Sequence, residues 1–157
     1  DASLAGDADA ADTMLEAAYE SGCAIRISRT TAAHAMSYQI TKRIGPAHGH
    51  ACMMTLPYLW RHMGDSPVIC ELNTLMGTAD GASLMLGLLA ATEMLPDTLP
   101  DDATLDALAA SVNTQRLGNH PEPLTTAELR DIYVQALSPV AAAEKERLAA
   151  LWRKYAE

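Results

Sequence analysis

The sequence contains no phenylalanine, and aromatic residues make up only 4% of its 157 residues. Aromatic and β-branched residues favour strands, whereas alanine, leucine and methionine favour helices. The apolar positions are filled largely by the second group, and no segment shows the alternating pattern that is typical of a strand. The composition therefore predicts an all-α helical bundle, and the length predicts one domain over residues 1–157.

Positive charge is also scarce, with 11 lysines and arginines against 20 aspartates and glutamates, which gives a net charge of −9. Such a chain repels phosphate backbones and anionic lipid headgroups. We therefore expect neither a nucleic-acid nor a membrane partner. The longest apolar stretch, residues 81–95, is interrupted by polar residues and is too short to span a bilayer.

Cysteine is limited to three residues, Cys23, Cys52 and Cys70, without CxxC spacing. They stand in apolar surroundings, which predicts reduced, buried thiols and a reducing, cytoplasmic setting. No signal peptide opens the chain. The chain starts at Asp1 without an initiator methionine and within a few residues of a helical pattern, so we expect it to be part of a larger protein.

Helical periodicity, N-caps and helix breakers divide the chain into segments. The expected helices begin at Asp12 or Thr13, at Thr30 or Thr31, near His48, after Pro67, near Ala79, at Asp101 or Asp102, at Thr125 and at Pro139. We expect Pro57 to kink its helix or to mark a turn, because proline removes a backbone donor and clashes with the preceding turn. Residues 115–123 are expected to form a loop, and Thr125 with Glu128 has the spacing of a capping box.

Three of the five histidines fall within residues 31–57, namely His34, His48 and His50. On one continuous helix His34 and His48 would lie roughly 21 Å apart, too far to share an ion. The Gly45-Pro46 break allows two helices to fold back as a hairpin with one imidazole on each arm, as in metal sites of helical bundles. His50 projects roughly 200° around the helix from His48 and is therefore a neighbour of such a site.

This spacing alone leaves open that His34 and His48 are ordinary core or surface residues. A catalytic ion also takes at least three protein ligands, so a third ligand, expected to be a carboxylate, must come from elsewhere. The upstream acidic residues have no ligand spacing and are instead predicted to start a solvated helix; they are Asp7, Asp9, Asp12 and Glu16.

The stretch HAMSYQITKRIGPAHGHACMMTLPYLW resembles the second metal-ligand region of the iron-containing (group III) alcohol dehydrogenases. That family has a histidine on one helix and, 14 residues later, a second histidine in a PHG turn, where Ala47 here replaces the proline. The resemblance covers residues 13 to about 137. It implies that His34 and His48 bind Fe2+, or Zn2+ or Mn2+, in the C-terminal part of a dehydroquinate-synthase-like helical domain. It further implies an NAD(P)H-dependent alcohol dehydrogenase or aldehyde reductase that forms a homo-oligomer at full length.

The sequence also departs from the family pattern. The family's other two ligands, an aspartate and a histidine four residues apart, are absent, as is its glycine-rich nucleotide-binding half. Many members carry a histidine near the nicotinamide at the position of Tyr38, which we take as the catalytic residue although a phenol is a poorer proton shuttle than imidazole. His50 is the candidate cofactor-binding residue.

The segment LAASVNTQRLGNHPEPLTTAELRDIY resembles that of a subgroup that reduces phosphonoacetaldehyde to 2-hydroxyethylphosphonate. This implies that Arg116 and Asn119 bind the substrate, and a guanidinium can bind a phosphonate with two parallel hydrogen bonds. Three alternatives stay open. The loop serves only to cap helices, the substrate is a small aliphatic alcohol or aldehyde, or the chain is a truncated helical module without catalytic activity.

Overall fold

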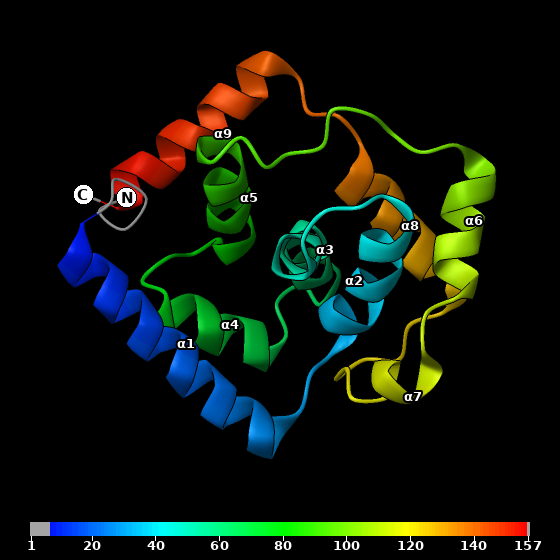
Figure 1. Cartoon of the computed structure of the whole chain (residues 1–157), viewed down its shortest axis with the longest axis horizontal. Coiled ribbons are helices and arrows are strands. Elements are labelled where there is room, and N and C mark those ends of the chain that lie inside the picture. Colours follow the sequence, from blue (N-terminus) through cyan, green and yellow to red (C-terminus); the bar gives the residue numbers. More distant parts are fainter. Residues whose placement is uncertain (1–6, 157) are drawn as a thin grey trace.

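The computed structural model describes residues 7–156, and all regular structure in this range is helical. The predicted all-α fold is therefore confirmed (Figure 1). The position of Asp1, on which the expectation of a larger protein rested, lies outside the described residues. The helices are α1 (Ala8–Ser28), α2 (Ala32–Arg43), α3 (His48–His62), α4 (Pro67–Leu75), α5 (Gly81–Ala91), α6 (Asp102–Ala110), α7 (Thr114–Leu117), α8 (Thr126–Leu137) and α9 (Ala142–Tyr155).

Side-chain caps fix several helix starts where the sequence predicts them. Asp101 accepts a hydrogen bond from the backbone N–H of Thr104 at 2.8 Å and begins α6. Thr125 and Glu128 form the predicted capping box of α8, with each side chain bonded to the other residue's backbone N–H. Each cap satisfies N–H groups that have no partner within the helix.

The first helix begins earlier than predicted. Asp7, rather than Asp12 or Thr13, is its N-cap, because the Asp7 carboxylate accepts hydrogen bonds from the backbone N–H groups of Asp9 and Ala10. The acidic residues nonetheless form the predicted solvated helix start, because all four of them are exposed, namely Asp7, Asp9, Asp12 and Glu16.

Other details of the prediction also change. Of the two expectations for Pro57, the turn is not formed, because helix α3 continues through Pro57 to His62. Helix α9 begins at Ala142 rather than at Pro139. The predicted loop contains one short helical turn, α7, whose N-cap is Asn113.

Helix α3 lies in the middle of the fold and contacts both of its hydrophobic clusters. It is viewed end-on at the centre of Figure 1, with α2, α6 and α8 on one side and α5 and α9 on the other. The first cluster includes Met36, Ile40, Leu105, Leu108 and Tyr133. The second consists of Leu86, Leu89, Leu95 and Leu148, with Met53 and Tyr58 of α3 packed against it.

The turn between α2 and α3 sets the position of the two histidines. Ile44 and Gly45 both donate backbone hydrogen bonds to the carbonyl of Ile40, at 2.8 and 3.2 Å, which closes α2. Gly45 then adopts φ +103°, a conformation that residues with a Cβ rarely adopt. Pro46 follows and ends any continuation of the helix. Helix α3 therefore packs back against α2.

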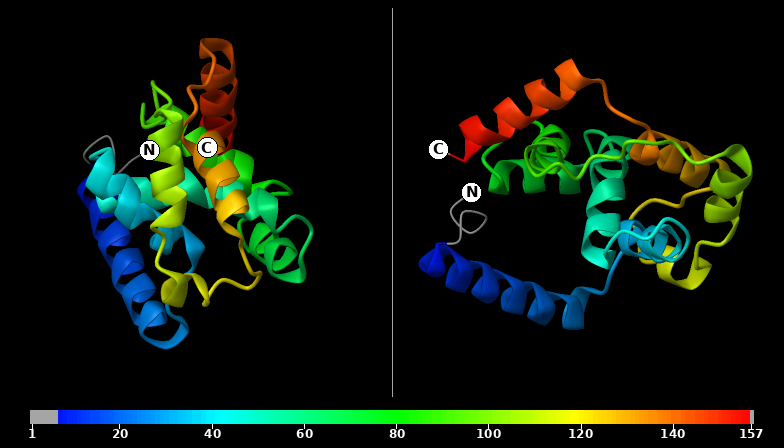
Figure 2. Two further views of the ribbon diagram at one scale, coloured as in Figure 1. Left: turned by 90° about the vertical axis from the view of Figure 1, so that its right-hand side faces the viewer. Right: turned by 45° about the horizontal axis from the view of Figure 1, so that its top comes forward.

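Helix α1 has no buried residue and stands apart from the central bundle in the right-hand view of Figure 2. Its apolar side chains include Leu15, Tyr19 and Ile27, which are 70%, 74% and 88% exposed. The prediction of three buried thiols is wrong, because Cys23 on α1 and Cys70 on α4 are exposed. None of the helices described here has the length and apolar character needed to cross a membrane.

Helices α5 and α9 approach closely because Gly87 has no side chain. A Cβ at this position would lie 2.7 Å from the Leu148 carbonyl oxygen and 3.0 Å from the Trp152 Cβ. We therefore expect Gly87→Ala to lower the free energy of unfolding by about 1–3 kcal/mol, measured by urea denaturation. Gly22→Ala is the matched control, because a Cβ there meets nothing within 4 Å, and it should leave stability unchanged or raise it. Equal stability of both variants would show that the close approach is not required.

Candidate metal centre

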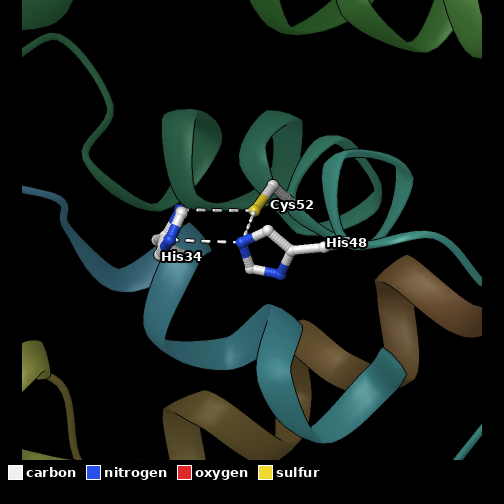
Figure 3. A group of neighbouring side chains, drawn as sticks. All are labelled: His34, His48 and Cys52. Atoms are coloured by element: carbon white, nitrogen blue, oxygen red, sulfur yellow. Dashed lines mark hydrogen bonds between the residues drawn. The ribbon is translucent and has the colours of Figure 1, made fainter. Parts of the chain in front are cut away.

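The structure brings His34 and His48 into direct contact. His34 lies on α2 and His48 is the first residue of α3, and their Nε2 atoms are 3.1 Å apart (Figure 3). The two ring centroids are 4.5 Å apart and the ring planes are nearly perpendicular. The proximity that the sequence predicts for these residues is thus present.

Ser37 determines which nitrogen of His48 faces His34. The buried Ser37 hydroxyl donates its single proton to the carbonyl of His34 at 2.8 Å. Its oxygen lies 3.2 Å from His48 Nδ1, so it accepts a hydrogen bond from a protonated Nδ1. With the proton on Nδ1, the lone pair of His48 Nε2 points toward His34. Metal-binding histidines are commonly oriented in this way, by a hydrogen bond from the ring nitrogen that does not bind the metal.

The electrostatic surroundings favour the neutral form of His34. Burial lowers the pKa of His34, and the nearby His48 and Arg116 lower that pKa further because they disfavour another positive charge. A lowered pKa favours the neutral imidazole, which is the form that binds a metal ion.

Cys52 completes a cluster of three possible ligands. It lies one helical turn after His48, and its Sγ is 3.6 Å from His34 Nδ1 and 3.9 Å from His48 Nε2 (Figure 3). His34, His48 and Cys52 form the one group of three or more candidate ligands found among residues 7–156. Within this range the candidate third donor is thus a thiol, and the carboxylate ligand expected from elsewhere stays a prediction. Sequence reasoning missed Cys52 although its i, i+4 spacing from His48 could have shown it.

Tyr38 and Arg116 lie beside the two histidines. The Tyr38 ring centroid is 5.4 Å from that of His34 and 5.0 Å from that of His48. Arg116 donates a hydrogen bond through Nη1 to the Tyr38 hydroxyl oxygen, and its Cζ lies 4.5 Å from the ring centroid. These residues line a surface cavity of about 280 Å³ together with Ala35, Gln39, Ser111 and Asn113.

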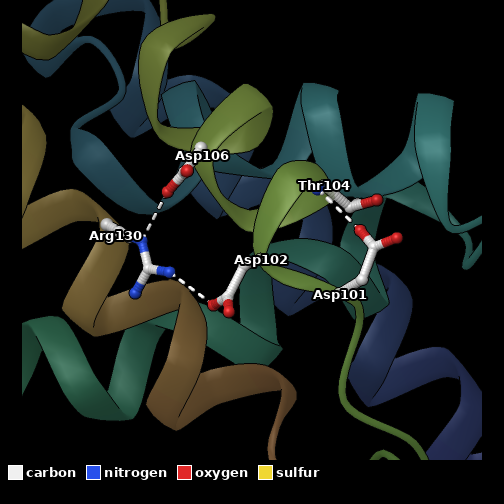
Figure 4. A network of polar contacts seen from close by, with 5 residues as sticks. All are labelled: Asp101, Asp102, Thr104, Asp106 and Arg130. Carbon is white, nitrogen blue, oxygen red and sulfur yellow. Dashed lines mark hydrogen bonds and ion pairs between the residues drawn. The ribbon is translucent and has the colours of Figure 1, made fainter.

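Helix α7, which carries Arg116, follows directly after α6, and α6 is held against α8 by a charged network. Arg130 of α8 contacts Asp106 at 2.5 Å and Asp102 at 2.6 Å (Figure 4). A guanidinium shared between two carboxylates has more fixed geometry than a single exposed pair. Asn113 then caps α7 by accepting a hydrogen bond from the backbone N–H of Arg116, whose side chain contacts Tyr38 of α2.

Two residues that were predicted to belong to the site, His50 and Asn119, form their hydrogen bonds away from the two histidines. His50 Nε2 lies 2.7 Å from the carbonyl oxygen of Met94, to which it donates a hydrogen bond, so its ring faces the segment after α5 and not the ring of His48. The Asn119 amide donates to the carbonyl of Thr30 at 3.3 Å and ties the loop after α7 to the start of α2. The roles of His50 in cofactor binding and of Asn119 in substrate binding stay predictions.

These residues fit a divalent metal ion. Two imidazole nitrogens at 3.1 Å are close enough to bind one ion, one ring is fixed by Ser37, and the pKa of the other is lowered. Imidazole accepts iron, zinc and manganese alike, so the donors alone do not select the metal. His34 and His48 would hold the ion, with Cys52 beside it.

Comparison with known proteins shows the family of the chain. Residues 2–137 match the model of the C-terminal region of the Fe-containing alcohol dehydrogenase family. The chain belongs to this family. It is also 48% identical over 58 residues to the phosphonoacetaldehyde reductase of Streptomyces viridochromogenes, a match that covers 37% of this chain and 15% of that protein. No solved structure matches the chain.

As a member of the Fe-containing alcohol dehydrogenase family, the chain represents its helical C-terminal region. The family implies a metal and a nicotinamide cofactor in the full-length enzymes. The imidazole pair of His34 and His48 is compatible with the metal. For the nicotinamide cofactor the chain offers no glycine-rich phosphate turn, so no nucleotide site is assigned to its residues.

The role of Ser37 can be tested by metal binding. We expect Ser37→Ala to weaken Zn2+ binding by about 10–100-fold, because His48 loses the hydrogen bond that fixes its ring. Isothermal titration of the purified protein measures this change. Ser28→Ala is the control, since the Ser28 hydroxyl is exposed on α1 and bonds to the carbonyls of Ala24 and Arg29. Equal affinities of the Ser37→Ala and wild-type proteins would rule out the orienting role.

Proposed function

We propose that this protein is a metal-dependent, NAD(P)-dependent aldehyde reductase that converts phosphonoacetaldehyde to 2-hydroxyethylphosphonate. Membership of the family supports alcohol dehydrogenase chemistry, and the similarity to a phosphonoacetaldehyde reductase supports the substrate. The observation that carries the proposal is the position of Arg116, whose guanidinium lies on the Tyr38 ring beside the paired histidines.

His34 and His48 hold the ion, which is Fe2+, Zn2+ or Mn2+. A bound divalent ion polarises the aldehyde oxygen as a Lewis acid when it is present. The residues of this chain contribute by lowering the pKa of His34, which favours its neutral imidazole, and by fixing the ring of His48 through Ser37.

Arg116 supplies the positive charge that a phosphonate requires in a chain of net charge −9. Its guanidinium is exposed, and only one of its hydrogen-bond donors is needed by Tyr38. Planar guanidinium groups bind phosphonate oxygens with two parallel hydrogen bonds, which a lysine ammonium cannot do. Arg116 thus places the anionic end of the substrate at one side of Tyr38 and its aldehyde toward the histidines.

Tyr38 takes the catalytic position in this proposal. Because Arg116 donates to the Tyr38 oxygen, the phenolic proton stays available to an acceptor in the cavity. A phenol next to a cation is a stronger hydrogen-bond donor than an isolated phenol. Tyr38 can therefore donate to the oxygen that develops negative charge during reduction.

The remaining predicted residues have supporting roles in the proposal. Asn119 acts by tying the loop after Arg116 to Thr30, which holds the substrate-binding segment against α2. His50 lines a separate cavity of about 350 Å³ with Met94 and Leu95, and its contact with the cofactor is proposed from the family resemblance alone. Formation of a homo-oligomer by the full-length enzyme and a cytoplasmic location are likewise proposals that rest on that resemblance.

Substrate selectivity tests the assignment of Arg116. We expect Arg116→Ala to raise KM for phosphonoacetaldehyde by about 10–100-fold, because a charge-assisted hydrogen bond is worth about 1.5–3 kcal/mol. The KM for propanal, which has no phosphonate, should change by less than about threefold. Both values come from steady-state oxidation of NADH or NADPH by the purified full-length enzyme.

Arg43→Ala is the matched control, because Arg43 lies in the last turn of α2, is exposed, and contacts only Gln39 among the described residues. It should leave both KM values unchanged. An equal effect of Arg116→Ala on the two aldehydes would contradict the phosphonate assignment and favour a dehydrogenase for small aliphatic substrates. Absence of any aldehyde reduction would favour a non-catalytic helical module.

A further inference from the structure

We infer that His120 is a positioning residue for Arg116, because its uncharged ring anchors the loop after α7 and protonation of the ring releases that loop. The inference rests on the proposed function, in which Arg116 binds the phosphonate, and adds to it a dependence of substrate binding on pH. Neither the family resemblance nor the comparisons assign a role to His120.

The backbone connects His120 directly to the turn that carries Arg116. The N–H of His120 donates a hydrogen bond to the carbonyl of Leu117 at 2.9 Å, and the N–H of Asn119 donates to the carbonyl of Arg116 at 3.3 Å. These two consecutive bonds join α7 and the start of the loop into one compact segment. A displacement of His120 therefore moves the residues that hold Arg116 beside Tyr38.

The His120 ring lines a small, mainly apolar cavity that lies against two other helices. The cavity has a volume of about 140 Å³, and its lining includes Leu59, Trp60 and Met63 of α3 and Val68, Ile69 and Leu72 of α4. Burial of a ring among such side chains is favourable because apolar surface is removed from water. The loop after α7 is thus held against α3 and α4 at His120, in addition to its hydrogen bond to the start of α2.

The anchoring contact accepts the uncharged ring only. Both ring nitrogens of His120 are shielded from solvent, and neither has a hydrogen-bond partner among residues 7–156. A buried imidazolium would carry a charge and two N–H donors without partners, which costs far more free energy than a buried neutral ring. Burial accordingly lowers the pKa of His120.

The charged groups near this ring do not reverse the effect of burial. Glu122 of the same loop raises the pKa of His120 and His62 of α3 lowers it, but burial is the largest of the three effects. Helix α4 and the start of α2 contribute no charged side chain to the lining of the cavity. The His120 ring therefore binds a proton more weakly in the anchored loop than in a released loop.

This difference fixes the direction of the pH dependence. Above the ordinary histidine pKa of about 6.5 the ring is uncharged in both states of the loop, so anchoring is complete. As the pH falls below that value, the released loop takes up a proton more readily than the anchored loop. Anchoring therefore weakens on acidification.

Hydrogen exchange of the full-length enzyme measures this anchoring independently of activity. The amides of residues 117–120 donate backbone hydrogen bonds within this segment. We expect their protection factors to fall at least about threefold when the pH is lowered from about 7.5 to about 5.5, after correction for intrinsic exchange. The amides of α9 should keep their protection, which excludes global unfolding.

His120→Phe is the matched variant, because phenylalanine keeps an aromatic ring for the apolar cavity and cannot take up a proton. We expect residues 117–120 of this variant to stay protected at both pH values. If His120→Phe fails to fold, as judged by circular dichroism, His120→Leu replaces it for the same reason.

Substrate binding reports the consequence for Arg116. Over the same pH change, we expect KM for phosphonoacetaldehyde to rise at least about threefold more in the wild type than in His120→Phe. The KM for propanal should respond equally in the two proteins. The phosphonate also gains a proton in this range, as phosphate monoesters do near about pH 6, but this contribution is common to both proteins.

Each outcome decides the question. Equal amide protection in the wild type and in His120→Phe at both pH values would overturn anchoring by His120. Loss of protection without the selective rise in KM would overturn its role in positioning Arg116. No reduction of phosphonoacetaldehyde at all would overturn the proposed function and the effect on substrate binding, whereas hydrogen exchange would still decide whether His120 anchors the loop.

Discussion

The candidate site depends on one backbone constraint, the reversal of the chain at Gly45 and Pro46. Gly45 has φ +103°, which is strained for a residue with a Cβ, and Pro46 cannot continue the helix. Without this reversal, His34 and His48 would lie on one helix roughly 21 Å apart. With the reversal, their Nε2 atoms are 3.1 Å apart, and the other site residues lie around the two rings.

The surrounding helices maintain this arrangement through packing. Helix α3 lies between the two hydrophobic clusters, so the helix that carries His48 is held by contacts on both sides. The buried Tyr133 hydroxyl of α8 donates to the carbonyl of Met36, 2.9 Å away and one residue before Ser37. The α2 backbone is thereby fixed next to the residue that orients His48. The stable core of the fold and the geometry of the site thus depend on the same helices.

Local signals in the sequence predicted much of this structure. The Gly45-Pro46 step, the Asp101 cap and the Thr125–Glu128 capping box act over a few residues, so they can be recognised without the fold. The facing of His34 and His48 followed from that step, whereas the substrate-binding role of Arg116 came from the family resemblance and its contact with Tyr38 was not predicted. Contacts between residues 78 positions apart leave no local pattern to recognise.

The errors have equally specific causes. Cys52 was missed because the search for a third ligand was directed at carboxylates, and because a cysteine in an apolar run is typical of packing. Cys23 and Cys70 were expected to be buried because they stand in apolar stretches of the sequence, but α1 has no buried residue and α4 has one, Ile69. Helix α1 began early because the Asp7 carboxylate is already placed to accept two N–H groups.

The most direct test of the central claim is the position of a bound ion. Crystals of the zinc-loaded protein, measured at the zinc absorption edge, would locate the ion by anomalous scattering. The account predicts one strong peak at about 2.0–2.1 Å from a ring nitrogen of both His34 and His48. A peak bound elsewhere, or rings of His34 and His48 that point into separate regions, would contradict it.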